Sequence, residues 1–278
     1  MSLRRLSVVV SIALSGACTL LIDTDDLDAG PAPIAPADDA GDTGPSASST
    51  DARTDGGALE DADAGPGSPC AEPHAFCDDF DDGSDDLAAR WDSLKTQAGP
   101  VSIATDRWVS APRALRAVVA PHTATLGSAL QKVVAIPNGK VNVEVDLHVE
   151  HTDGSWVEVD PVEIILRPGP PGYDHHSLYL ILHQTEQLFL YYAPKTDGGY
   201  DIRTQSASFA MGSWQHLVFT FESSPARATL AIDGVTVPLD TFAGPTVTSL
   251  ELGVGAAYTE NVTNDWKITL DNVVVDTP

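Results

Sequence analysis

Residues 140–150 have the sequence "KVNVEVDLHVE", and this stretch decides the fold class. Its apolar residues occupy every second position: Val141, Val143, Val145, Leu147 and Val149. Its polar residues alternate with them: Asn142, Glu144, Asp146, His148 and Glu150. Successive side chains of a strand point to opposite faces of the sheet. The alternation therefore predicts a β-strand with one buried face and one wet face.

Similar short alternating runs recur along the chain between clusters of Gly, Pro, Asp and Ser. They are "SLYLILHQ" at 177–184, "QLFLYYA" at 187–193, "WQHLVFTFE" at 214–222, "RATLAIDG" at 227–234 and "KITLDNVVVD" at 267–276. The one helix candidate is "SDDLAARW" at 84–91, where Ser84 could cap one or two turns. This pattern predicts an all-β fold over residues 70–278, a two-sheet antiparallel β-sandwich or jelly roll.

The first eighteen residues resemble a bacterial lipoprotein signal peptide. Arg4 and Arg5 precede an apolar run at 6–14 that is too short to span a bilayer, and small residues then lead to Cys18. We expect Cys18 to become lipidated, which would anchor an exported protein to one leaflet. The expected location is the outer membrane or cell surface of a Gram-negative bacterium. An ordinary secretory signal containing a stray cysteine is the alternative.

Residues 19–69 consist almost wholly of Asp, Ala, Gly, Pro, Ser and Thr, and Arg53 is the only basic residue among them. A segment with so few large apolar residues and so much charge of one sign cannot offset its ordering entropy, so we expect a disordered linker. The whole chain has a formal net charge of −25. That charge favours solubility and repels anionic partners, and it predicts no nucleic-acid binding.

Two cysteines remain in "CAEPHAFC" at 70–77. In an exported protein, where oxidation is permitted, Cys70 and Cys77 are expected to form a disulfide that closes a small loop. A zinc pair is the competing interpretation. His74 is the only nitrogen ligand nearby, and a tetrahedral zinc site needs four ligands.

Three segments carry a resemblance to a known superfamily. They are "FCDDFDDGSDDLAARW" at 76–91, "GSWQHLVFTFESSPARATLAIDGVTV" at 212–237 and "WKITLDNVVVD" at 266–276. Their order and spacing resemble the concanavalin A-like lectin and glucanase superfamily, including its laminin-G-like members. The resemblance implies a jelly roll with one concave sheet, with the last strand beside the first, and with carbohydrate as the usual ligand class.

The same resemblance implies a structural calcium ion between the first and last strands. In this sequence its carboxylate ligands would be Asp79 or Asp81 at one end and Asp271 at the other. Calcium takes six to eight oxygen ligands, and a divalent cation favours crowded carboxylates. The alternative is that "CDDFDDGSDD" at 77–86 forms a solvated acidic turn.

"EVDPVE" at 158–163 matches the E-x-D-x-x-E pattern of family-16 glycoside hydrolases, which belong to this superfamily. In such an enzyme Glu158 would be the nucleophile, Glu163 the general acid and Asp160 the carboxylate that tunes them, with the outer carboxyls about 5 to 5.5 Å apart. In a regular strand Glu158 and Asp160 share a face and Glu163 points away. The chemistry therefore requires a β-bulge between them.

Two features argue against catalysis. Pro161 lies inside the motif, where the resembled pattern has an aliphatic residue. The apolar residues at 162–166 also suggest the start of a new strand, which would leave 150–161 as a loop and let Glu163 pair with Arg167. Without supporting structural context, we expect spare carboxylates in an acidic protein rather than an active site.

The sequence therefore favours a non-catalytic, lectin-like module that binds a glycan or a protein surface and touches the membrane only through its lipid anchor. The candidate ligand-binding residues are Trp156, Tyr173, Tyr179, His183, Tyr191 and Tyr192. One alternative is a glycoside hydrolase or polysaccharide lyase that uses Glu158 and Glu163. The other is an adhesive or structural protein-interaction module.

Overall fold

The computed structural model describes residues 68–151, 158–169, 175–183, 187–194, 200–223, 226–238 and 246–278. The predicted signal peptide, its lipidation site Cys18 and nearly all of the predicted linker lie outside the described residues. The chain is described below from Ser68 onward.

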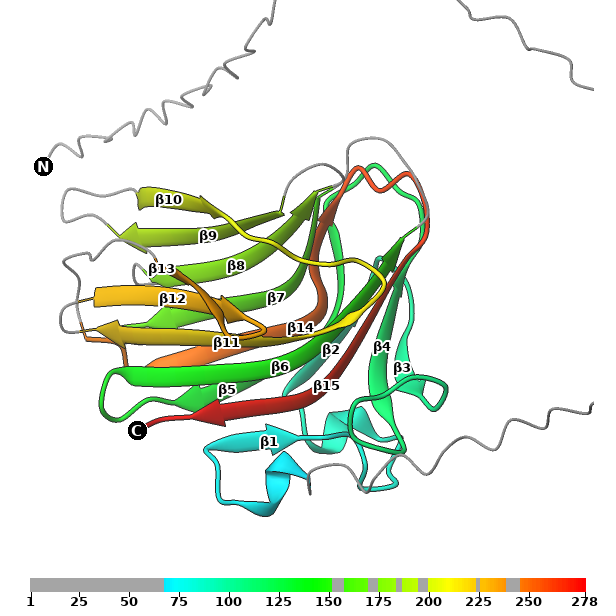
Figure 1. Cartoon of the computed structure of the whole chain (residues 1–278), viewed down its shortest axis with the longest axis horizontal. Coiled ribbons are helices and arrows are strands. Elements are labelled where there is room, and N and C mark those ends of the chain that lie inside the picture. Colours follow the sequence, from blue (N-terminus) through cyan, green and yellow to red (C-terminus); the bar gives the residue numbers. More distant parts are fainter. Residues whose placement is uncertain are drawn as a thin grey trace, which may run out of the picture. The chain divides into compact units, whose positions relative to one another are not determined.

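Fifteen strands in the described residues build two antiparallel sheets, which Figure 1 shows as curved layers stacked on one another. We name each sheet after one of its central strands. The β6 sheet contains, in spatial order, β13 (Val235–Pro238), β12 (Ala226–Ile232), β11 (Trp214–Ser223), β6 (Lys140–His151), β15 (Trp266–Asp276), β4 (Ala114–Val119) and β3 (Val101–Ala104), with β1 (Phe76–Asp78) also paired to β15. The β7 sheet contains, in spatial order, β10 (Tyr200–Ser206), β9 (Gln187–Pro194), β8 (His176–His183), β7 (Glu158–Arg167), β14 (Ser249–Glu260), β5 (Leu126–Ala135) and β2 (Ser93–Thr96). The predicted all-β, two-sheet sandwich is confirmed.

The core is formed by the inner faces of the two sheets. All five apolar residues of the 141–149 alternation are buried on β6, as the sequence predicts. Val159, Val162, Ile164 and Leu166 of β7 are buried in the same cluster. Each such side chain contributes roughly 1.5–3 kcal/mol when it leaves water. Burial of these alternating residues fixes which face of each strand remains outside.

The outer face of β6 is not wholly wet, contrary to the sequence prediction. Asp146 and His148 on this face are buried. Arg107, from the segment before β4, donates from Nη1 to Nε2 of His148 at 2.8 Å and pairs through Nη2 with Oε1 of Glu150 at 2.7 Å. A polar side chain can be buried on a sheet face when such partners satisfy it.

The beginning and the end of the described chain meet in the β6 sheet. β1 pairs antiparallel with β15, and Phe76 lies opposite Val275, so the pairing of first and last strands is confirmed. Cys70 and Cys77 form the predicted disulfide, which rules out the zinc alternative because these thiols are oxidised. His74 within the loop contacts Oδ1 of Asp276 through Nδ1 at 2.8 Å.

The expected helix at 84–91 is a single 3-10 turn, Leu87–Ala89, whose N-cap is Asp86 rather than Ser84. The turn places Leu87 and Trp91 in the core, which gives it a packing role despite its short length. Among the described residues, no helix has the length and apolar character that crossing a membrane requires.

Candidate functional site

The E-x-D-x-x-E segment lies on one continuous strand that contains a β-bulge. β7 runs from Glu158 to Arg167 and β6 ends at His151, so the expectation of a loop is wrong for residues 150–151 and 158–161, while residues 152–157 lie outside the described residues. Val159 pairs with Leu182 and Val162 pairs with Leu180, so β7 has one residue more than β8 in this interval. The extra residue belongs to Asp160–Pro161, where proline is tolerated because a bulge interrupts the ladder of hydrogen bonds.

The bulge changes which way Glu163 faces. Val159 and Val162, on either side of it, are both buried in the core. The acidic residues next to these valines in the sequence point the other way, and all three line one groove: Glu158, Asp160 and Glu163. The sequence analysis required a β-bulge that puts the three carboxylates on one face of the strand. The structure contains this bulge.

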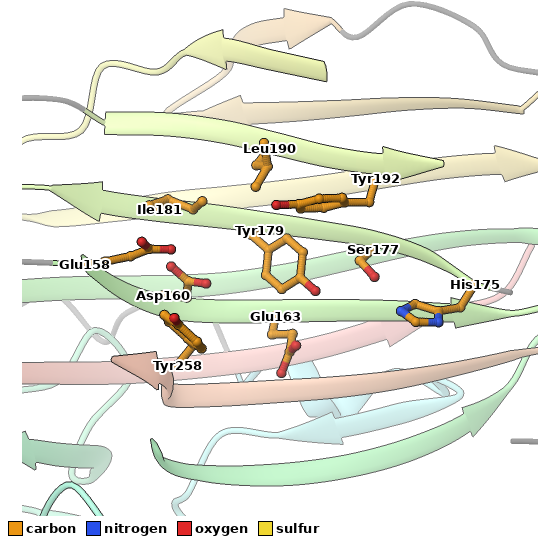
Figure 2. Close-up of a pocket in the computed structure, with 10 residues that line it drawn as sticks. All are labelled: Glu158, Asp160, Glu163, His175, Ser177, Tyr179, Ile181, Leu190, Tyr192 and Tyr258. Carbon is orange, nitrogen blue, oxygen red and sulfur yellow. The ribbon is translucent and has the colours of Figure 1, made fainter. Parts of the chain in front are cut away.

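The groove has a volume of about 390 Å³ and lies on the outer face of the β7 sheet. Its walls come from neighbouring strands of the β7 sheet, β9, β8, β7 and β14, and Figure 2 shows how the lining side chains lie. Its lining residues are Glu158, Asp160, Glu163, His175, Ser177, Tyr179, Ile181, Leu190, Tyr192 and Tyr258. The groove thus combines carboxylates with aromatic rings, which is the composition expected of a site for a polar organic ligand.

Asp160 and Glu163 have perturbed acidities. Burial, with a further contribution from the nearby carboxylates of Glu158 and Glu163, raises the pKa of Asp160 well above its usual value. Burial also raises the pKa of Glu163, against the opposing effects of Lys95 and of a hydrogen bond from the Tyr179 hydroxyl. Both groups therefore hold a proton at a higher pH than ordinary carboxyls do.

The expected pairing of Glu163 with Arg167 is replaced by a different ion pair. Nη2 of Arg167 contacts Oε2 of Glu251, on the adjacent strand β14, at 3.0 Å. Glu163 instead lies opposite Tyr179 on β8 and Gly253 on β14. A Cβ atom on Gly253 would lie 3.6 Å from Oε2 of Glu163, so the glycine keeps the groove free of a side chain there.

Tyr179 and Tyr192 form one aromatic wall of the groove. Their ring centroids are 5.8 Å apart with an interplanar angle of 89°, an edge-to-face contact. The wall is fixed by strand alternation, because Ser177, Tyr179 and Ile181 occupy every second position of β8. Both tyrosines were among the ligand-binding residues that the sequence suggested.

Tyr258 forms the opposite side of the groove, and sequence reasoning missed it. It pairs with Asp160 across β14 and β7, at a point where β14 also has a register shift. Gly255 in this irregular segment has φ of +123°, a backbone conformation that favours glycine. The Tyr258 hydroxyl donates a hydrogen bond to Oε2 of Glu260 at 2.8 Å.

The other predicted ligand-binding residues are not assigned to the groove. Trp156 and Tyr173 lie outside the described residues. His183 is on β8 opposite Glu158, and Tyr191 is on β9 opposite Leu178. Their roles therefore stay predictions.

The three carboxylates suggested for calcium are held by hydrogen-bond donors. Oδ2 of Asp271 accepts from the backbone N–H groups of Val109 and Ser110, at 2.8 and 2.9 Å, and its Oδ1 accepts from the N–H of Asn272 at 2.8 Å. Oδ1 of Asp81 accepts from the N–H of Arg113 at 2.9 Å, and Oδ1 of Asp79 accepts from the N–H of Asp81 at 3.2 Å.

These hydrogen bonds use some of the carboxylate lone pairs that a calcium ion would need. Among the described residues, no group of three or more His, Cys, Asp and Glu side chains converges as a metal site. Calcium binding at Asp79, Asp81 and Asp271 stays a prediction. Equal thermal unfolding midpoints in calcium and in a chelator would contradict it.

The sequence matches no protein-family model and no curated protein. Among solved structures, the chain is similar to an endo-1,3-beta-glucanase from Streptomyces sioyaensis, with a TM-score of 0.50 and 15% identity over 77% of this chain and 99% of that chain. It is also similar to a sialidase, with a TM-score of 0.50 and 14% identity over 73% of this chain. That match covers only 19% of the sialidase chain.

At these identities the likeness shows the fold alone. The two stacked antiparallel sheets define the chain as a jelly-roll β-sandwich. More particularly, its fold is similar to that of the glucanase, and a jelly roll is what the resemblance of the segments at 76–91, 212–237 and 266–276 implied.

Proposed function

We propose that the groove over β7, β8 and β9 binds a carbohydrate chain and hydrolyses it with retention of anomeric configuration. The observation that carries this proposal is the bulge at Asp160–Pro161, since it gives Glu158 and Glu163 the same groove. A motif counts as evidence only when its structural context agrees, and the bulge that this motif requires supports the proposal. The likeness to a glucanase fold supports the ligand class by analogy.

The chemistry of the groove suits a sugar. The rings of Tyr179, Tyr192 and Tyr258 can cover the apolar faces of sugar rings. Ser177 and the carboxylates can hydrogen-bond to the sugar hydroxyls. A few polar groups among aromatic and apolar walls, here including Ile181 and Leu190, give both affinity and orientation.

The proposed reaction has two steps. First, a Glu158 carboxylate oxygen bonds to the anomeric carbon while the glycosidic C–O bond breaks, and Glu163 gives its proton to the leaving oxygen. Next, Glu163 takes a proton from water, whose oxygen displaces Glu158 from the anomeric carbon and restores both groups. The raised pKa of Glu163 fits the first step, because a general acid must be protonated at the working pH.

A glycan-binding module without catalysis is the second candidate. Pro161 favours it, because the family-16 pattern that the motif resembles has an aliphatic residue at that position. In that case the same carboxylates would only accept hydrogen bonds from sugar hydroxyls. The two candidates share the binding groove and differ in one measurable step, cleavage of the glycosidic bond.

The test is release of reducing ends from laminarin, other β-glucans and a broader panel of polysaccharides. We expect wild-type protein to release them from at least one of these polysaccharides, and Glu158→Gln to reduce that release to background while still binding the substrate. Glu222→Gln, on β11 of the other sheet, is the matched control and is expected to retain full activity.

Other outcomes of this assay separate the alternatives. Binding without hydrolysis would support the non-catalytic module and contradict the hydrolase. Unsaturated ends detected by ultraviolet absorbance would indicate a lyase. If the protein bound no glycan on an array but bound a specific protein partner, this would indicate an adhesive module.

We also propose that the protein is exported and lipid-anchored at Cys18. Residues 1–18 support this, and so does the Cys70–Cys77 disulfide, since disulfides form and persist in oxidising compartments. Cys18→Ser should move the protein from the membrane fraction to the soluble fraction of the native cell. Unchanged fractionation would contradict the anchor.

A further inference from the structure

We infer that the groove selects glycans built from amino sugars, with a free ammonium group of the sugar bound beside Oδ1 of Asp160. This inference rests on the proposed function, because it assigns the substrate class of the same groove. Its basis is the combination of one unpartnered buried carboxylate oxygen, the charge of the groove and the aromatic rings that line it.

One oxygen of the Asp160 carboxyl group has no hydrogen-bond donor among the described residues. Asp160 is only 4% exposed, and its Oδ1 is buried without a hydrogen-bond partner among the described residues. Figure 2 shows its carboxyl group in the groove, near Glu158. A buried acceptor without a donor is costly, so a ligand that brings a donor there gains the energy of satisfying it.

The charge around this oxygen favours a cationic donor over a neutral one. The groove lining contains three carboxylates and, among the described residues, neither a lysine nor an arginine. Of the nearby basic residues, Arg167 forms an ion pair with Glu251, and the charge of Lys95 lowers the pKa of Glu163. A sugar hydroxyl could satisfy Oδ1, but an ammonium group would also reduce the repulsion among the carboxylates.

The aromatic lining is compatible with the same ligand. The faces of tyrosine rings carry negative potential and attract ammonium groups within about 6 Å. Tyr179 and Tyr192 form one wall, and Tyr258 pairs with Asp160 from the other side. Carboxylates and aromatic faces around one position form an amine-binding environment. The same environment disfavours glycans that carry carboxylate or sulfate groups.

The experiment compares two ligands of equal length that differ only at nitrogen, deacetylated and N-acetylated chito-oligosaccharides. Binding is measured by calorimetry on the full chain carrying Glu158→Gln, which prevents cleavage, at a pH at which the sugar amine is protonated. We expect the amine form to bind at least about tenfold more tightly, the ratio expected for one charge-assisted hydrogen bond.

Adding Asp160→Asn should remove this preference. Adding Asp92→Asn should keep it, because that aspartate contacts Lys132 and does not line the groove. An amine preference that survives Asp160→Asn would overturn the inference. If the Asp160 variant does not fold, the ratio in the parent protein still tests the inference, since a ratio near one contradicts it.

Failure of the inference can be distinguished from failure of the proposed function. Equal or tighter binding of the acetylated ligand, or cleavage of laminarin with no binding of either chito-oligosaccharide, would overturn the amine site and leave the hydrolase proposal standing. Amine-selective binding that depends on Asp160, with no hydrolysis of any polysaccharide, would support the amine site and contradict hydrolysis.

Discussion

Asp160 shows the conflict between stability and function at the scale of one residue. It is buried beside two other carboxylates, and its Oδ1 has no partner among the described residues. Such a group destabilises the fold when it is charged, because burial removes its hydration and its neighbours repel it. Strongly perturbed groups of this kind cluster at functional sites, which is where proteins tolerate the cost.

Replacing Asp160 should therefore change how stability depends on pH. The folded pKa of Asp160 is raised above its unfolded value of about 3.9, so the free energy of unfolding falls as pH rises from the unfolded pKa through the folded pKa. Asparagine does not titrate. We expect Asp160→Asn to raise the thermal midpoint relative to wild type by an amount that grows as pH rises from the unfolded pKa toward the raised folded pKa, reaching the few degrees that about 1–3 kcal/mol would produce.

Thermal unfolding followed by circular dichroism across this pH range measures the effect. Glu222→Gln, a carboxylate outside the groove, should show no growing difference over the same range. A midpoint for Asp160→Asn that is lower than wild type by the same amount at every pH would contradict the account, because it would mean that this carboxyl does not titrate at a raised pKa.

Residues whose role follows from alternation were predictable, and those whose role depends on register were not. The apolar face of β6 could be predicted because strand alternation is local. The shared face of Glu158 and Glu163 depends on how β7 pairs with β8 and β14, and the sequence could state only that a bulge was required. Tyr258 was missed because its place beside Asp160 arises from pairing between distant strands.

At the scale of elements, the junction of β1 and β15 fixes the start of the folded chain. Oδ2 of Asp78 on β1 accepts a hydrogen bond from Nε1 of Trp91 at 2.7 Å, and its Oδ1 contacts Nη1 of Arg90 at 2.9 Å. Phe80, two residues after Asp78, packs with its ring parallel to that of Trp91. Here both oxygens of a buried carboxylate have donors, in contrast to Oδ1 of Asp160.

Trp91→Phe tests this junction, because it keeps most of the ring packing and removes the donor to Asp78. We expect it to lower the free energy of unfolding by about 1–3 kcal/mol, the cost of leaving a buried acceptor unpaired. Urea unfolding measures the change. Trp108→Phe, at a more exposed tryptophan, is the control and should have a much smaller effect. Equal effects of the two substitutions would show that the indole N–H bond does not stabilise the junction.

The pairing of these elements was predictable only in part. The resemblance of 76–91 and 266–276 to the first and last strands of a known superfamily predicted that β1 lies beside β15. The loop with Cys70 and Cys77 predicted the disulfide. The hydrogen bonds that occupy Asp271 could not be predicted, because its donors come from residues 109–110, a segment without a recognisable pattern.

For the whole molecule, the arrangement of two sheets separates stability from function. The inner faces form one hydrophobic cluster, and the outer face of the β7 sheet bears the groove. Strands that are distant in sequence supply the groove because the topology places β7 between β8 and β14. Alternation and turn residues predicted this architecture, whereas fold alone leaves the activity undecided.

The most direct test of the central claim is proton NMR of a polysaccharide during hydrolysis by the purified protein. The claim is that the bulge in β7 gives Glu158 and Glu163 one groove, where they cleave a glycosidic bond through a covalent intermediate. The account predicts that, with a β-linked polysaccharide that the protein cleaves, the first anomeric signal to appear is that of the β-anomer, before mutarotation. An α-anomer appearing first, or no new reducing end with any polysaccharide that the protein binds, would contradict it.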